Sequence, residues 1–264
     1  MALMTLPLAI HPKTSHPDNP YLSELNSLPR PEEIEYKYNL ASLFSGGGGL
    51  DVGLALAGFQ PRFSSDIEEP HCKTISYNFP QDVAISKDVS MISGDEIKQL
   101  SGVGEFDLLS GGSPCQSFSI LGRRSSFEDP RGKLVFEYIR IINELQPKAF
   151  IFENVPGLLT VNNGEDWKQL YEYMCAETGY SVKYTVLNSA DFGVPQIRKR
   201  VIAVGIRDKS KVYDFPKPTL KYWTKHERHR PTRANQDLDS AASAARNPIP
   251  HETNCKTVFH PAAP

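Results

Sequence analysis

The chain has 264 residues and a mass of 29.5 kDa, enough to bury one large or two small hydrophobic cores. Hydrophobic residues make up 39% and charged residues 23%, which is typical of a globular rather than a disordered protein. No apolar run approaches the roughly 20 residues that span a bilayer, so no membrane partner is expected. The four cysteines are widely spaced, which argues against a disulfide framework and for a reducing, cytoplasmic setting.

The net charge of −2 hides an uneven distribution along the chain. Residues 196–264 hold 14 Lys and Arg against 6 Asp and Glu, whereas residues 1–195 hold 15 basic and 25 acidic side chains. A surplus of positive charge confined to one end predicts that this end faces a polyanion.

Short apolar runs alternate with amphipathic segments along most of the chain. We predict strands at 40–44, 62–66, 106–110, 149–153, 181–187 and 201–206, and helices at 50–57, 70–77, 134–145 and 167–180. The last two strands fit a hairpin. This alternation is typical of an α/β sheet with helices on both faces. We expect residues 1–37 to form an N-terminal arm, 38–210 the α/β domain, and 211–264 a basic tail or the start of a further, recognition region.

The glycine-rich segment SGGGGLD follows the first predicted strand and opens the first helix. Glycines let the backbone approach a ligand closely, and a helix N-terminus favours negative groups. No Gly-Lys-Ser/Thr follows, which excludes a P-loop. Asp66 ends the second strand and suits ribose hydroxyls, while Asp88, in KDVS, would follow the sheet's third strand, between the strands at 62–66 and 106–110, and suits an adenine. Taken singly, each aspartate fits a loop or cap equally well, but together they predict an adenosine cofactor.

A cysteine loop, GGSPCQSFS, comes directly after the strand predicted at 106–110. The carboxyl edge of an α/β sheet is where binding sites form. Cys115 lies between Pro114 and Gln116 in a glycine-flanked loop, which favours a nucleophile over a packing residue. The other three cysteines lie in helical or tail contexts, and we expect them to be structural.

Two further polar groups stand next to predicted strands. Glu153 and Asn154 end an otherwise apolar strand, which makes them candidates for a site. Arg198 and Arg200 alternate just before the last strand, so both are expected on one face. Taken alone, the arginines fit a solvated basic turn equally well.

Taken in order, several segments resemble the DNA (cytosine-5)-methyltransferase family: FSGGGG, SSDIEE, KDVS, GGSPCQSFS, RGKLVFE, FENVPGLL and LNSADFGVPQIRKR. The resemblance extends from about Leu40 to Gly205. Pro-Cys-Gln, Glu-Asn-Val and Gln-x-Arg-x-Arg in this order are highly specific. The resemblance implies a Rossmann-like S-adenosylmethionine-dependent methyltransferase sheet and methyl transfer to C5 of a flipped-out cytosine in duplex DNA.

The resemblance also implies catalytic roles. Cys115 would add to C6 of cytosine, because that addition makes C5 an enamine-like carbon able to attack a methyl group. Glu153 would bond the cytosine N3 and exocyclic amine, and Arg200 would bond O2. Arg198 would lie beside the site, and Asn154 would position the loop.

S-adenosylmethionine is the implied cofactor. The positions that match its pocket are Phe44, Gly46, Gly48, Asp66, Ile67, Asp88, Val89, Pro114 and Leu134. The ribose-binding acid is more often Glu in the family, so Asp66 is one methylene shorter.

The segment 119–132 resembles the loop that closes over DNA. The implied DNA contacts are Gln116, Ser119, Arg123, Arg124 and Arg131. No metal is implied, since the tail residues His226, His229, Cys255 and His260 fit no recognised zinc spacing.

The family's two terminal motifs, Arg-x-x-x-x-Arg-Glu and Gly-Asn-Ser/Ala-Val, are not found after Gly205. We therefore expect this chain to be the catalytic subunit of a two-chain enzyme from a restriction–modification system. The second polypeptide of that enzyme would carry target recognition and the two terminal motifs. The alternatives are a truncated inactive fragment, a non-catalytic regulatory or DNA-binding subunit of the same fold, and a tRNA cytosine-5 methyltransferase. The expected location is the bacterial cytoplasm, at the nucleoid.

Overall fold

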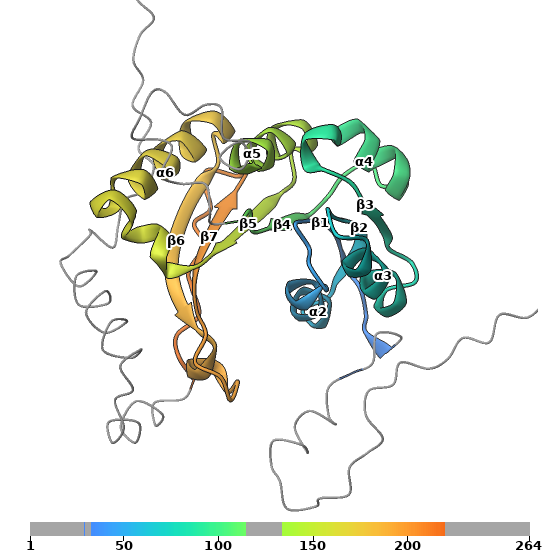
Figure 1. Ribbon diagram of the computed structural model, residues 1–264, viewed down its shortest axis with the longest axis horizontal. Helices are drawn as coiled ribbons and strands as arrows, with labels where there is room; N and C mark the ends of the chain where they lie inside the picture. Colours follow the sequence, from blue (N-terminus) through green and yellow to red (C-terminus); the bar gives the residue numbers. More distant parts are fainter. Residues whose placement is uncertain (1–28, 30–32, 115–133, 220–264) are drawn as a thin grey trace, which may run out of the picture.

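The computed structural model describes residues 29, 33–114 and 134–219. Its centre is a seven-stranded sheet in the order β3-β2-β1-β4-β5-β7-β6 (Figure 1). The strands are β1 (Tyr38–Leu43), β2 (Phe59–Asp66), β3 (Val83–Ser86), β4 (Leu108–Gly111), β5 (Ala149–Asn154), β6 (Ser181–Asn188) and β7 (Lys199–Ile206). Strands β1 to β5 pair in parallel, whereas β7 runs antiparallel to both of its neighbours, β5 and β6.

Helices cover both faces of this sheet, as the α/β alternation predicts. One face carries α4 (Gly94–Ser101), α5 (Leu134–Leu145) and α6 (Glu165–Thr178) (Figure 1). On the other face, α2 (Gly49–Leu56) and α3 (Glu69–Asn78) lie beside β1, β2 and β3. The Rossmann-like α/β fold is therefore confirmed.

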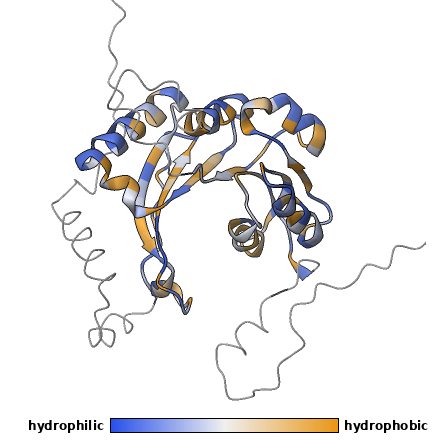
Figure 2. Cartoon of the chain, viewed as in Figure 1, coloured by the Kyte–Doolittle hydropathy of each residue, from blue (hydrophilic) through white to orange (hydrophobic). Residues whose placement is uncertain are grey.

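The main core lies between the sheet and the α4–α6 layer. Helix α5 forms over the range that its sequence predicts, because apolar side chains recur at helical spacing. Val135, Tyr138, Ile142 and Leu145 are all buried. Figure 2 shows polar and apolar residues mixed along α5 and α6. Helix α6 ends where Gly179 adopts a left-handed φ of 67°, at the predicted stop.

Strands β1 and β7 begin two residues before their predicted ranges, and β3 lies at a position for which no range is predicted. Helix α4 and strand β2 differ more clearly from the prediction. Helix α4 is not predicted, although its ends are well marked: the Ser93 side chain accepts a hydrogen bond from the Glu96 N–H, and Gly102 ends it in the left-handed region. Its sequence, GDEIKQLS, has only Ile97 and Leu100 as large apolar residues, too few to reveal the helical repeat of apolar positions. Strand β2 begins at Phe59, ahead of the prediction, and an irregular register beside Leu40 accommodates Pro61, which cannot donate to the ladder.

Both ends of the described chain contact the domain. Ile34 and Tyr36 pack against the small cluster of Ala55, Ile75 and Phe79, so the end of the predicted arm lies on α2 and α3. At the other end, the Thr219 N–H donates to the Asp191 carbonyl. Among the described residues, no helix is long and apolar enough to cross a membrane.

Candidate active site

The candidate site residues gather at one edge of the sheet. Parallel strands end at a common edge, and β7 starts there because it runs antiparallel to β5. We call residues 44–48, 66–67 and 88–89 the cofactor edge, since they follow β1, β2 and β3. We call residues 112–114, 153–154 and 200 the base edge, since they lie at the ends of β4 and β5 and the start of β7.

The glycine loop leaves β1 by a sharp change of direction. Gly46 and Gly48 have φ of 54° and 82°, which favour glycine. Phe44 has φ of 54° as well, a strained conformation for a residue with a side chain. A Cβ placed on Gly46 or Gly47 would meet no atom within 4 Å, so the loop backbone is open to a ligand.

Asp66 holds this loop from the end of β2. Its Oδ2 accepts a hydrogen bond of 2.8 Å from the Gly46 N–H, and its Oδ1 accepts one of 3.0 Å from the Glu68 N–H. His71 Nδ1 lies 3.0 Å from the same Oδ1. Burial alone would raise the pKa of Asp66, but these hydrogen bonds outweigh it and the pKa is lowered. Asp66 is therefore an anion that joins two segments of the cofactor edge.

The other residues predicted to line the cofactor pocket differ in their exposure. Ile67 is 68% exposed, which is unusual for an isoleucine beside a charged loop. Asp88 caps the short turn 89–91 by accepting hydrogen bonds from the Ser90 N–H and hydroxyl. Val89 is buried behind it. Phe44 and Leu134 pack partly buried against the main core, and Pro114 is exposed.

The base edge is centred on an ion pair between two strands. Arg200 Nε lies 2.7 Å from Glu153 Oε1, and the two side chains are 24% and 29% exposed. Both are accessible enough to meet a ligand. A Cβ on Gly112 would lie 2.6 Å from the Glu153 carbonyl oxygen and 2.9 Å from its Oε2. Only glycine therefore lets the Glu153 side chain lie against the start of the cysteine loop.

Asn154 fixes that same loop. It is buried, and its Nδ2 donates to the Ser113 carbonyl at 2.9 Å, two residues before Cys115. Its Oδ1 accepts from the Val155 N–H at 2.9 Å, which sets the amide orientation. Arg198 precedes β7 and is exposed. Its backbone N–H donates to Asn188 Oδ1, and the contacts described for it do not join its side chain to Glu153.

Several predicted positions lie outside the described residues. These are Cys115, Gln116, Ser119, Arg123, Arg124 and Arg131, and in the tail His226, His229, Cys255 and His260. Within the described ranges, no group of three or more His, Cys, Asp or Glu residues is placed to hold a metal ion. Cys72 and Cys175 are both buried, and burial raises the pKa of the Cys72 thiol.

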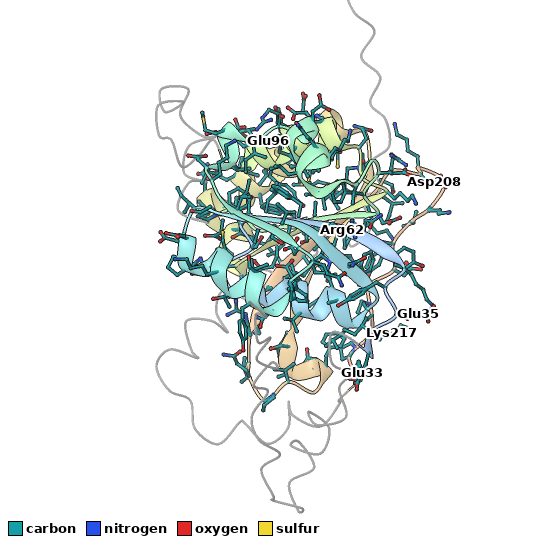
Figure 3. The ribbon with its side chains drawn as sticks, turned by 90° about the vertical axis from the view of Figure 1, so that its right-hand side faces the viewer. Glu33, Glu35, Arg62, Glu96, Asp208 and Lys217 are labelled. Carbon is teal, nitrogen blue, oxygen red and sulfur yellow. The ribbon has the colours of Figure 1, made fainter. Side chains whose placement is uncertain are left out.

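Sequence reasoning missed a buried acidic pair behind the cofactor edge. Asp51, in the first turn of α2, is fully buried, and Asp82 is 8% exposed. No hydrogen bond of ordinary length and angle joins either carboxylate to another described residue, although the Ser42 hydroxyl lies near Asp51 and the Ser64 hydroxyl near Asp82. Nε of nearby Arg62, which Figure 3 labels on β2, is likewise without such a bond among the described residues. Burial raises the pKa of each carboxyl to about 6. The Ser42 hydroxyl lowers the pKa of Asp51, and the Ser64 hydroxyl lowers that of Asp82, but burial has the larger effect. No sequence period marks burial of these polar residues.

A family model of C-5 cytosine-specific DNA methylases matches residues 38–259. The chain belongs to this family.

The relatives of this methylase agree with that placement. The type II methyltransferase M.AquIA of Picosynechococcus is 42% identical over 189 residues, which cover 68% of this chain and 76% of the relative. M.XorII of Xanthomonas oryzae is 41% identical over 181 residues, but these cover 67% of this chain and only 42% of the relative. A candidate DNA modification methyltransferase from an E. coli prophage superposes with a TM-score of 0.58 at 30% identity, over 68% of this chain and 49% of that chain.

Two facts follow from membership of the methylase family. Its enzymes methylate cytosine in DNA, and their cofactor is S-adenosylmethionine. The chain spans about half the length of several curated relatives that it matches, such as M.XorII and M1.HphI.

Proposed function

We propose that this chain is the catalytic part of a DNA cytosine-5 methyltransferase that is completed by a second polypeptide. The carrying observation is the base edge: the Glu153–Arg200 pair lies beside the loop that Asn154 ties down just before Cys115. A carboxylate and a guanidinium that face one ligand offer an acceptor and donors together, which matches the amine, N3 and O2 edge of cytosine.

The cofactor edge fits S-adenosylmethionine. The open backbone at Gly46 and Gly47 suits the amino-acid part of the cofactor, and Asp66 suits its ribose. The exposed Ile67 offers an apolar surface to the adenine, beside Asp88 and Val89. When bound, S-adenosylmethionine supplies the methyl group.

The protein residues would prepare the cytosine to accept it. The Cys115 thiolate adds to C6, and the electron pair of the C5–C6 double bond becomes available at C5. Glu153 and Arg200 would hold the ring and stabilise charge at N3 and O2 during this step. C5 would take the methyl group, and S-adenosylhomocysteine would be left as the second product. The C5 proton would then pass to a base, the C5–C6 double bond would re-form and the Cys115 thiolate would be expelled. Asn154 would act through the loop, because its Nδ2 bonds the Ser113 carbonyl two residues before Cys115 in the sequence.

Two observations support a second polypeptide. The residues matched to M.AquIA cover 76% of that relative and 68% of this chain, so the two chains are of similar length. A chain of about this length therefore occurs elsewhere in the family. In addition, the described helices leave one sheet face uncovered beneath β5, β7 and β6 (Figure 1). Ile151 and Ile202 on that face are half-buried, and an added segment would complete their burial.

Duplex DNA is the proposed substrate, and the enzyme would be part of a restriction–modification system. Its proposed location is the bacterial cytoplasm, at the nucleoid. The basic residues of 196–264 and Arg123, Arg124 and Arg131 would contact phosphates. Neutralising the basic tail is therefore expected to weaken DNA binding and flatten its salt dependence.

A methyl-transfer assay tests the proposal. The full chain is combined with the polypeptide encoded next to it, and transfer of labelled methyl from S-adenosylmethionine to duplex DNA is measured with tRNA as competitor. We expect transfer to DNA that needs both polypeptides and is lost in Cys115→Ala. Cys175→Ala serves as the matched control, because Cys175 is a buried cysteine on α6 in the main core and belongs to neither edge. Transfer that survives Cys115→Ala, or that goes only to tRNA, would contradict the proposal.

A further inference from the structure

Arg140 on α5 lies outside every motif assigned above, yet it makes four polar contacts. Its Nη2 donates to the backbone carbonyls of Val89 at 3.1 Å and Ile92 at 2.8 Å. Its Nε donates to Glu137 Oε2 and its Nη1 to Glu144 Oε1, each at 2.7 Å. One guanidinium therefore joins α5 to the turn that follows Asp88.

Glu144 extends this connection to the next helix. Its Oε2 accepts a hydrogen bond of 2.6 Å from the Gly94 N–H at the start of α4. A Cβ on Gly94 would lie 2.7 Å from the Glu144 Cβ, so the two helices approach as closely as glycine allows. At the near end of the same turn, Lys87 Nζ lies 2.7 Å from Oε1 of Glu96, which Figure 3 labels in the helical layer. The segment 87–94 is thus held to α4 and α5 at several points.

Asp88 itself contributes only local order. Its carboxylate caps Ser90, which shapes the turn but does not anchor it to the rest of the domain. Among the contacts that tie the segment to the helical layer, those of Arg140 reach the turn itself, because its guanidinium bonds the carbonyls on both sides of residues 90 and 91.

We propose that Arg140 is a positioning residue for the cofactor: its guanidinium holds the 89–92 turn so that Asp88 and Val89 meet the adenine. This inference rests on the proposed function, which assigns these two residues to the adenine. Arg140 touches no reacting atom and acts only through the turn. A lysine cannot replace it, since an ammonium is a single point with three donors, whereas the planar guanidinium serves four acceptors in fixed directions.

The test compares Arg140→Met and Arg140→Lys with Arg207→Met in the active preparation. Arg207 is a matched control, because its guanidinium also bonds a carbonyl, that of Gln146, and a glutamate, Glu105, but it lies at the far edge of the sheet. The dissociation constant of S-adenosylmethionine is measured by calorimetry, and kcat and both KM values by methyl transfer.

We expect both Arg140 variants to raise the cofactor dissociation constant and KM about tenfold, since hydrogen bonds to a charged group are lost. The kcat at saturating cofactor and the KM for DNA should stay within about twofold of the wild type, and Arg207→Met should bind cofactor normally. If Arg140→Met does not fold, Arg140→Lys and Glu144→Gln carry the test.

Equal cofactor binding in the wild type, both Arg140 variants and Arg207→Met would overturn the inference. An equal loss of binding in Arg140→Met and Arg207→Met would do so too, because it would show general destabilisation. Failure of the proposed function is distinguishable, since the wild type itself would then neither bind S-adenosylmethionine nor transfer methyl.

Discussion

At the cofactor edge, Asp66 and Asp88 accept hydrogen bonds mainly from backbone N–H groups, whereas at the base edge Glu153 bonds the side chain of Arg200. Backbone donors are fixed by the path of the chain, so the cofactor edge is shaped before any ligand arrives. A side-chain ion pair can reorganise, and both partners remain partly exposed. Under the proposed function, the cofactor edge is therefore held in place by the backbone, whereas the two side chains of the base edge bond one another until a base enters.

The largest effect is expected from Gly112→Ala, which should disturb the base edge and leave the cofactor edge intact. The new Cβ would lie 2.6 Å from a backbone oxygen of Glu153, so the strand end must shift. We expect kcat for methyl transfer to fall about 100-fold, because small displacements of reacting groups are costly. Cofactor affinity measured by calorimetry should not change.

The control for that variant is Gly104→Ala, where no atom lies within 4 Å of the added Cβ. It should retain full activity. If Gly112→Ala weakened cofactor binding as much as it lowered kcat, the two edges would not be independent.

Asp66→Ala should give the reverse pattern: it should weaken cofactor binding and leave the chemical step nearly unchanged. It removes the acceptor of the Gly46 and Glu68 N–H groups, so the glycine loop loses its tie to β2. We expect KM for S-adenosylmethionine to rise about tenfold or more, while kcat at saturating cofactor stays within a few-fold. Steady-state kinetics at varied cofactor measures both. A fall in kcat with unchanged KM would contradict the assignment, and Asp66→Asn, which keeps one acceptor, should lie between.

The buried acids predict the smallest effect, on stability rather than activity. The pKa of Asp51 is about 6 in the fold and near 3.8 when exposed, so between these pH values the native state binds more protons than the unfolded state. The free energy of unfolding should therefore fall as pH rises from 4 to 6, by on the order of 2 kcal/mol from Asp51. Asp82, whose pKa is also raised to about 6, should add to this fall.

Urea unfolding across this pH range measures that slope. Asp51→Asn should flatten it, whereas Asp214→Asn should leave it unchanged, since the Asp214 side chain is 96% exposed. An identical slope in Asp51→Asn and the wild type would show that Asp51 does not carry a raised pKa. The base edge has no such unpartnered acid among the described residues.

Sequence alone determined the fold class and most elements, because each depends on local pattern. Helix α5 occupies its predicted range, Gly179 ends α6, and β6 and β7 form the expected hairpin. Sequence also placed Glu153 and Asn154 at the end of a strand, since the change from apolar to polar residues is visible in a few letters. The family motifs then supplied roles that no periodicity contains.

Only the tertiary structure decided which of these residues meet. Strand β7 lies between β5 and β6, and that order brings Arg200 to Glu153 but leaves Arg198 outside the strand. The bond from Asn154 to Ser113 and those from Arg140 to Val89 and Ile92 join segments far apart in the chain. Local propensity carries no information about such pairs, because strand order and helix packing fix them through the burial of the whole core.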